Sequence, residues 1–208
     1  LAIRHGETAW NVDTRIQGHL DIPLNKQGLK QAQCLSRALA DNDTVHAVYA
    51  SDLSRAHTTA SAIAQAMGLA VVAHTGLRER HFGEFQGRTF AEIEAELPEH
   101  ALQWRTRVPE WTPPGGGESL VVLRERILQT VDELAAQHLG QQIVLVAHGG
   151  VLDILYRAAT RLDLQAPRSW QLTNTAVNRL LWTPEGLSLV GWGDTSHLET
   201  LGQDESTT

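Results

Sequence analysis

Two histidines each stand between an apolar run and a glycine, and these two residues are the first candidates for reactive side chains in this chain. They are His5 in AIRHGET and His148 in LVAHGGV. A neutral imidazole can act as a nucleophile or as a metal ligand. Arg4 directly precedes the first histidine, and Arg55 follows a third apolar run in SDLSRAHTTA. Because arginine donates two parallel hydrogen bonds and keeps its charge, the combination favours a site for a phosphate group.

Taken singly, these residues also have plainer interpretations. A lone histidine at a strand end is more often a hydrogen-bonded structural residue, and a lone arginine is usually a solvated surface charge. A zinc site of His5, His57 and His148 is a rival, but an arginine beside a ligand histidine disfavours a cation. The chain also has no compact Cys/His cluster. We therefore expect no metal and no cofactor, while the residue types alone leave phosphate binding and a structural role equally open.

The elements that must position these residues follow from hydrophobic spacing. Strands are predicted at 1–3, 45–51, 69–73 and 143–146, with two more in AVNRLLW and LSLVGW near the end. Helices are predicted at 26–41, 53–67, 89–97 and 150–161, and after a cap at Ser119. This alternation indicates an α/β fold with a mostly parallel sheet. Ligands of such sheets bind beyond the carboxyl ends of the strands, so both histidines are expected to face one cleft.

Length and composition limit what the protein can be. The 208 residues suit one domain over 1–208, and no linker or repeat suggests a boundary. A net charge of −7 argues against a nucleic-acid partner, and no apolar run approaches the length of a membrane helix. The single cysteine, Cys34, excludes an internal disulfide and favours the cytoplasm, and no signal peptide is visible in a sequence that begins at Leu1.

Five sequence blocks resemble, in order, the signature blocks of the histidine phosphatase superfamily. They are RHGETAWN, RIQGHLDIPLNKQG, SDLSRAHTTA, LRERHFGEFQG and VAHGG. The resemblance is to the branch that contains phosphoglycerate mutases and broad-specificity phosphatases. It implies a phosphoglycerate mutase-like, three-layer α/β/α sandwich with a small helical cap over the cleft.

The resemblance also implies a role for individual residues. His5 would be the nucleophile that becomes phosphorylated, and Glu79 the proton donor. The phosphate pocket would be completed by Arg4, Arg55 and His148, and the phosphoryl group would be contacted or bordered by Asn11, Gln17 and Gly149. Because His5 must present an unprotonated ring nitrogen to phosphorus, its other nitrogen should donate to a fixed acceptor, for which a backbone carbonyl is the candidate.

The same family contains mutases and phosphatases, and the chain departs from the mutase pattern. Mutases carry Tyr and Lys where this chain has Phe82 and Phe90, and paired arginines where it has Arg105 and Thr106. A short TPPGGGES segment replaces their long insertion. These differences predict a weak grip on a glycerate carboxylate and easier entry of water. We therefore expect a metal-independent phosphomonoester hydrolase that works through phosphohistidine on small phosphorylated metabolites.

Two alternatives stay open at this stage. One is a 2,3-bisphosphoglycerate-dependent phosphoglycerate mutase, and the other is a non-catalytic phosphate-binding or phosphorelay module. The aromatic residues around 82–111 hint at a substrate with an apolar or sugar-like body, although such residues more often serve packing. An exposed strand edge near the C-terminus could pair two copies as a homodimer.

Overall fold

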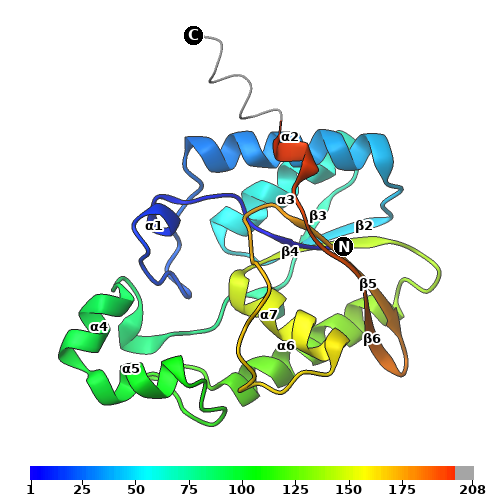
Figure 1. The fold of residues 1–208 in the computed structure, drawn as a ribbon. Coiled ribbons are helices and arrows are strands. Elements are labelled where there is room, and N and C mark those ends of the chain that lie inside the picture. The colour runs from blue at the N-terminus through cyan, green and yellow to red at the C-terminus, as the bar shows by residue number, and fades with distance from the viewer. Residues whose placement is uncertain (200–208) are drawn as a thin grey trace.

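One twisted sheet forms the centre of the computed structural model, which describes residues 1–199 (Figure 1). In this described part, six strands pair in the order β3-β2-β4-β1-β5-β6. The strands are β1 (Ala2–Arg4), β2 (Ala47–Ala50), β3 (Val71–Ala73), β4 (Ile143–Ala147), β5 (Val177–Thr183) and β6 (Gly186–Asp194). The first four run parallel, and β5 and β6 form an antiparallel pair at one side. The predicted mostly parallel sheet is confirmed.

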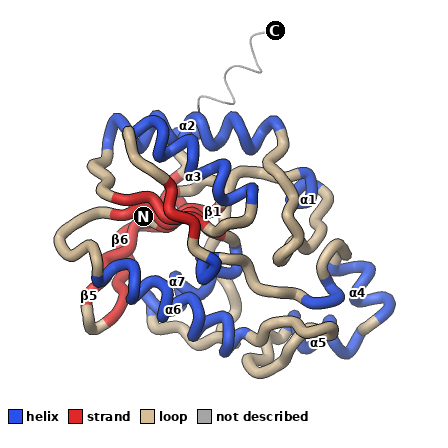
Figure 2. The backbone as a smooth tube through the Cα atoms, turned by 180° about the vertical axis from the view of Figure 1, so that it is seen from behind, coloured by secondary structure: helices blue, strands red, loops and turns tan. Residues whose placement is uncertain are grey.

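Helices cover both faces of this sheet, as the two opposite views show (Figures 1 and 2). They are α1 (Ala9–Val12), α2 (Lys26–Asn42), α3 (Ser54–Met67), α4 (Phe90–Glu96), α5 (Pro98–Arg105), α6 (Leu120–Ala136) and α7 (Gly149–Thr160). α2 and α3 lie on one face and α6 and α7 on the other, which gives three layers, while α4 and α5 stand to one side. Within residues 1–199, no helix combines the length and the apolar character needed to cross a lipid bilayer.

The continuous apolar run of β4 is explained by burial on both faces. Val144 and Val146 pack in the core that lies under α2 and α3. Leu145 and Ala147, which point the other way, pack in the core formed with α6 and α7. Alternate residues of a strand face opposite sides of a sheet, so a central strand between two helical layers is apolar at every position.

Local sequence signals set most helix ends where they were predicted. The Asn25 side chain accepts a hydrogen bond from Gly28 N at the start of α2, and Ser119 caps α6 in the same way. Thr89 and Glu92 form the predicted capping box of α4. Gly68 ends α3 in the left-handed region, with φ of 67°. These short-range contacts depend on neighbouring residues alone, which is why the sequence predicts them.

Three details differ from the sequence-based expectation. The strands predicted at 45–51 and 69–73 are shorter, spanning 47–50 and 71–73. The polar stretch before Pro23, where no helix was predicted, contains the four-residue helix α1, which begins with a capping box at Thr8. A helix of one turn has no periodic apolar face, so hydrophobic spacing does not reveal it.

Two glycines bring α2 against the loop that follows β1. A Cβ on Gly6 would lie 2.5 Å from Gly28 O, and a Cβ on Gly28 would lie 2.1 Å from Glu7 O. Any side chain at either position would therefore collide with backbone that cannot move independently. The backbone of the first turn of α2 thus fixes the position of residues 5–7.

We predict that Gly28→Ala destabilises the protein, because the added methyl group forces apart two packed backbone segments. The free energy of unfolding should fall by about 1–3 kcal/mol, as for other overpacked sites, in urea denaturation followed by circular dichroism. Gly191→Ala is the control, since its added Cβ would meet its nearest neighbour at 4.0 Å. Equal stability of the two variants would contradict the close approach.

Candidate active site

The two histidines are brought together by the pairing of β1 with β4. His5 follows β1 and His148 follows β4, and the His5 amide donates to Ala147 O at 3.0 Å. Their ring centroids are 5.2 Å apart. Arg55 reaches the same region from the first turn of α3, after β2. The two strand ends meet as predicted, but only His5 lines the cavity described below, because His148 is completely buried beside it.

The hydrogen bonds of His5 define its tautomer. Its Nδ1 lies 2.7 Å from Gly6 O, and because a carbonyl oxygen only accepts, Nδ1 carries the hydrogen. Nε2 is therefore left with its lone pair. The backbone here is held by Thr59, whose hydroxyl accepts from Gly6 N, and by Asn174, whose amide donates to His5 O at 2.7 Å. The expected carbonyl acceptor is Gly6 O.

Burial and neighbouring charge keep both imidazoles neutral. His5 is 3% exposed, and its burial lowers its pKa well below 6.5, with the charges of Arg4 and Arg55 lowering it further. The Gly6 carbonyl only partly offsets this effect. The pKa of His148 is likewise lowered by complete burial, then by Arg55. At neutral pH the site therefore contains two uncharged rings beside two guanidinium groups.

Several buried polar atoms around His5 have no hydrogen-bond partner among the described residues. They are the Nε atoms of Arg4 and Arg55, both ring nitrogens of His148 and Oε1 of Gln17. The two terminal nitrogens of Arg55 are held by Leu20 O at 2.8 Å and Gly18 O at 2.7 Å. Native proteins rarely leave buried polar groups unpaired, so this concentration favours a polar ligand in contact with them.

A cavity of about 180 Å³ contains most of the predicted site residues. Its wall includes Arg4, His5, Asn11, Gln17, Arg55 and Glu79. His148 is absent from this wall and lies fully buried beside His5, and Gly149 lines an adjoining cavity instead. The cavity size and its three arginines, Arg4, Arg15 and Arg55, suit a small tetrahedral anion.

Glu79 lies opposite the histidines and is held by backbone amides. Its carboxylate accepts from Arg80 N at 2.8 Å and from Gly150 N at 3.0 and 3.1 Å. Gly150 is in the first turn of α7, where the amide groups have no partner within the helix and can hold this side chain in place. A Cβ on Gly150 would lie 2.2 Å from Glu79 Oε1, so only glycine allows this contact.

The backbone that carries Glu79 is supported by residues that the sequence did not single out. Arg126 of α6 donates to Gly76 O, Arg78 O and Glu79 O at 2.8, 3.0 and 3.3 Å. The same guanidinium pairs with Glu118 through two hydrogen bonds of 2.8 and 2.7 Å. His19 Nε2 also lies 2.7 Å from Glu79 O. Nothing in the spacing of these residues marks them, because the contacts join segments far apart in the chain.

The rival zinc set is not assembled. His57 is exposed on α3, where its ring lies 3.4 Å from the Ser61 hydroxyl. In the part of the chain that the structure describes, no three His, Cys, Asp or Glu side chains are placed to share a metal ion.

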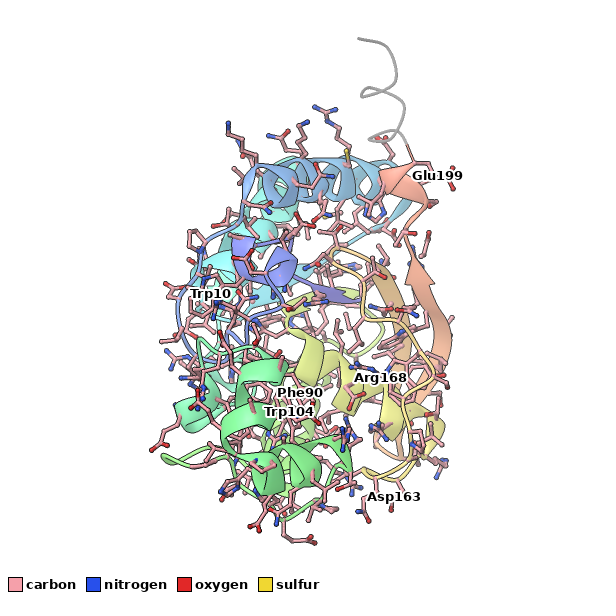
Figure 3. All side chains as sticks on the ribbon, turned by 60° about the vertical axis from the view of Figure 1, so that its left-hand side comes forward. Trp10, Phe90, Trp104, Asp163, Arg168 and Glu199 are labelled. Carbon is pink, nitrogen blue, oxygen red and sulfur yellow. The ribbon has the colours of Figure 1, made fainter. Side chains whose placement is uncertain are left out.

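The aromatic residues predicted near the cleft have different positions. Phe85 is completely buried in the small core under α4 and α5. Phe82 and Trp104 line a second cavity, and Phe90 packs on Trp104 with ring centroids 5.4 Å apart. Figure 3 shows Phe90 and Trp104 together at the α4–α5 side of the molecule. Only part of the aromatic cluster therefore borders the site, and the rest holds the two small helices together.

Comparison with known proteins gives matches over nearly the full chain. Residues 1–195 match the model of the histidine phosphatase superfamily, branch 1. Phosphoglycerate mutase-like protein 4 of Arabidopsis thaliana is 39% identical, over 97% of this chain and 87% of that protein. Metal-independent phosphoserine phosphatase of the same plant is 36% identical, over 97% and 84%. The structure of a mycobacterial glucosyl-3-phosphoglycerate phosphatase is 33% identical, with a TM-score of 0.82 over 93% of this chain and 98% of that chain.

We predict that the cavity beside His5 binds inorganic phosphate and that Arg55→Lys weakens this binding at least about tenfold. A lysine cannot offer the planar pair of donors that arginine presents to a phosphate. Isothermal titration calorimetry at pH 7 measures the Kd. Arg124→Lys, at an exposed position of α6, is the matched control. Equal affinity of both variants for phosphate would contradict this assignment.

Proposed function

Because this chain belongs to branch 1 of the histidine phosphatase superfamily, we propose that its phosphatase reaction uses His5 as the nucleophile. The protein is a phosphatase of small phosphorylated metabolites. The observation that carries the residue assignment is the neutral, Nδ1-protonated His5 in a cavity with Arg4 and Arg55. An imidazole in this state has a lone pair to give, and the arginines offset the charge that would repel it.

In the first step, the phosphoryl group of the substrate lies in the small cavity. Nε2 of His5 forms a bond to phosphorus as the bond from phosphorus to the ester oxygen breaks. Arg4, Arg55 and His148 hold the other three oxygens during this transfer, and Glu79 gives its proton to the departing oxygen. The products are a free alcohol and phosphohistidine at position 5, with Glu79 ionised.

In the second step, water attacks the phosphohistidine. Ionised Glu79 accepts a proton from the water as its oxygen bonds to phosphorus, and the bond between phosphorus and Nε2 breaks. Inorganic phosphate leaves, and His5 returns to its neutral form with the hydrogen still on Nδ1. Asn11, Gln17 and Gly149 border the phosphoryl group in this scheme. No metal ion is needed, because the guanidinium groups supply the positive charge.

Transfer to a second substrate hydroxyl instead of water would make the protein a mutase. Phe82, Phe90 and Thr106 stand where the mutases carry polar or charged side chains, which supports hydrolysis as the main reaction. The cavity contains the carboxyl group of Glu79, the neutral ring of His5 and the guanidinium groups of Arg4 and Arg55. The presence of all the groups that the reaction needs argues against a module that binds phosphate without turnover.

We also infer a cytoplasmic location and a dimer. A single cysteine, Cys34, favours a reducing compartment. β6 is the last strand of the sheet, and Val190 on it is 67% exposed, so a second copy of the chain could pair along this edge. The acidic net charge of −7 supports small phosphorylated substrates rather than nucleic acid as the ligand.

We predict that Glu79→Gln accumulates phosphohistidine when the substrate is p-nitrophenyl phosphate. The p-nitrophenolate group leaves without a proton, so the first step proceeds, whereas attack by water loses its base and slows by about 10²–10⁴-fold. Rapid quench with ³²P-labelled substrate in EDTA measures the acid-labile, base-stable phosphoenzyme. The parent enzyme should turn over in EDTA with little phosphoenzyme present.

His5→Asn should form no phosphoenzyme and release no phosphate. His57→Asn is the control, because that histidine is exposed on α3 and outside the cavity. Turnover by His5→Asn would reject His5 as the nucleophile, and complete loss of parent activity in EDTA would reject a metal-independent reaction.

A further inference from the structure

A second cavity borders the small cavity beside His5, which is called the phosphoryl pocket below. Its volume is about 470 Å³, and Arg4 and Phe82 line both cavities. Gly149 and Gly150 from the start of α7 form part of its wall, so it lies next to the Glu79 carboxylate as well. On the proposed function, this cavity is where the organic part of the phosphomonoester must extend.

The cavity has an excess of positive charge. Four arginines line it, namely Arg4, Arg80, Arg107 and Arg168, against one carboxylate, Asp153. That carboxylate is already bound by Arg107 at 2.6 Å and by Arg157 at 2.9 Å. Burial lowers the pKa of Arg4, and the nearby charge of Arg168 contributes to lowering it. An anionic group in the cavity would relieve this repulsion.

Apart from Arg4, which holds the phosphoryl group in the proposed reaction, Arg168 is the arginine of this set that is free to meet a ligand. Arg80 is fixed by Glu118 O at 2.7 Å, and Arg107 by Leu164 O and Asp153. Within residues 1–199, no hydrogen bond or ion pair engages the Arg168 guanidinium, and the side chain is exposed. One unengaged planar fork matches one carboxylate group.

The segment that carries Arg168 is fixed at two points. Trp170 is buried and stacks on Tyr156 of α7, with ring centroids 4.0 Å apart and an interplanar angle of 20°. Two residues later, Leu172 O accepts a hydrogen bond from Nη1 of Arg4. Figure 3 shows Arg168 on this segment after α7. The guanidinium is therefore carried by a stretch of chain that is tied to a phosphate-binding arginine.

We propose that Arg168 binds a carboxylate on the leaving part of the substrate, so that the preferred substrates are phosphomonoesters of hydroxy acids. The aromatic side chains of Phe82, Trp104 and Trp170 line the same cavity as this cation and offer apolar surface to the carbon atoms of the substrate. The segment at 168–172 thus supplies the grip on a carboxylate that Phe82, Phe90 and Thr106 do not supply. The inference rests on the proposed phosphatase reaction.

The test compares 3-phosphoglycerate with glycerol 3-phosphate, which carries a hydroxymethyl group in place of the carboxylate. The parent should prefer 3-phosphoglycerate in kcat/KM for release of inorganic phosphate. Arg168→Gln should lower this preference about tenfold, mainly through KM, because the lost ionic hydrogen bonds act on bound substrate and transition state alike. Arg168→Glu should lower it further. Arg124→Gln removes one exposed positive charge outside the cavity and should leave the preference unchanged.

The outcomes separate this inference from the function on which it rests. Release of phosphate from both esters with no preference, or a preference that Arg168→Gln leaves unchanged, would overturn the inference and leave the phosphatase assignment standing. An equal loss in Arg124→Gln would overturn it too, since the effect would then come from net charge. Absence of phosphate release from both esters and from p-nitrophenyl phosphate would overturn both.

Discussion

The hydrogen bond from Nδ1 of His5 to Gly6 O is the interaction on which the site depends. It fixes the hydrogen on one ring nitrogen and leaves the other nitrogen unprotonated beside Arg4 and Arg55. Burial of the ring disfavours its charged form, and the charges of Arg4 and Arg55 disfavour it further, so the ring stays neutral where an exposed histidine would be partly charged. The same charges would attract a phosphate dianion, so in the proposed reaction one arrangement both activates the nucleophile and binds its target.

A few contacts between elements of the fold hold the residues around His5 in position. Parallel pairing of β1 with β4 brings two strand ends to one edge of the sheet, and the starts of α3 and α7 add Arg55 and the amide of Gly150. The loop after β1 is held against α2, because the backbone at Gly6 packs closely on Gly28. On the opposite side, Arg126 holds three carbonyls of the segment that ends at Glu79. His5 and Glu79 lie outside the helices and strands, and they are thus held in place by contacts with α2, α6 and α7.

The fold class, most helix ends and the candidate site residues were predictable from the sequence, because each depends on residues close together in the chain. The strand and helix pattern and the caps at Asn25 and Ser119 depend on residues close in sequence. The proposed catalytic residues could be named because they occur in short sequence motifs, most of them at strand ends. The Arg126–Glu118 pair and the cavity with Arg168 were not found, because each joins segments whose approach is decided only by tertiary packing. The expected weak grip on a carboxylate rests on Phe82, Phe90 and Thr106, whereas Arg168, which we propose for this role, belongs to another segment.

The protonation state of His5 tests the central claim most directly. Long-range ¹H–¹⁵N NMR of the protein labelled in its histidines reports the charge and the tautomer of each ring, and the spectrum of His5→Asn assigns the signal. At pH 6, below the usual pKa of about 6.5, we expect His5 to be neutral, with the hydrogen on Nδ1 and none on Nε2. An imidazolium at this pH, or a neutral ring with its hydrogen on Nε2, would contradict the account.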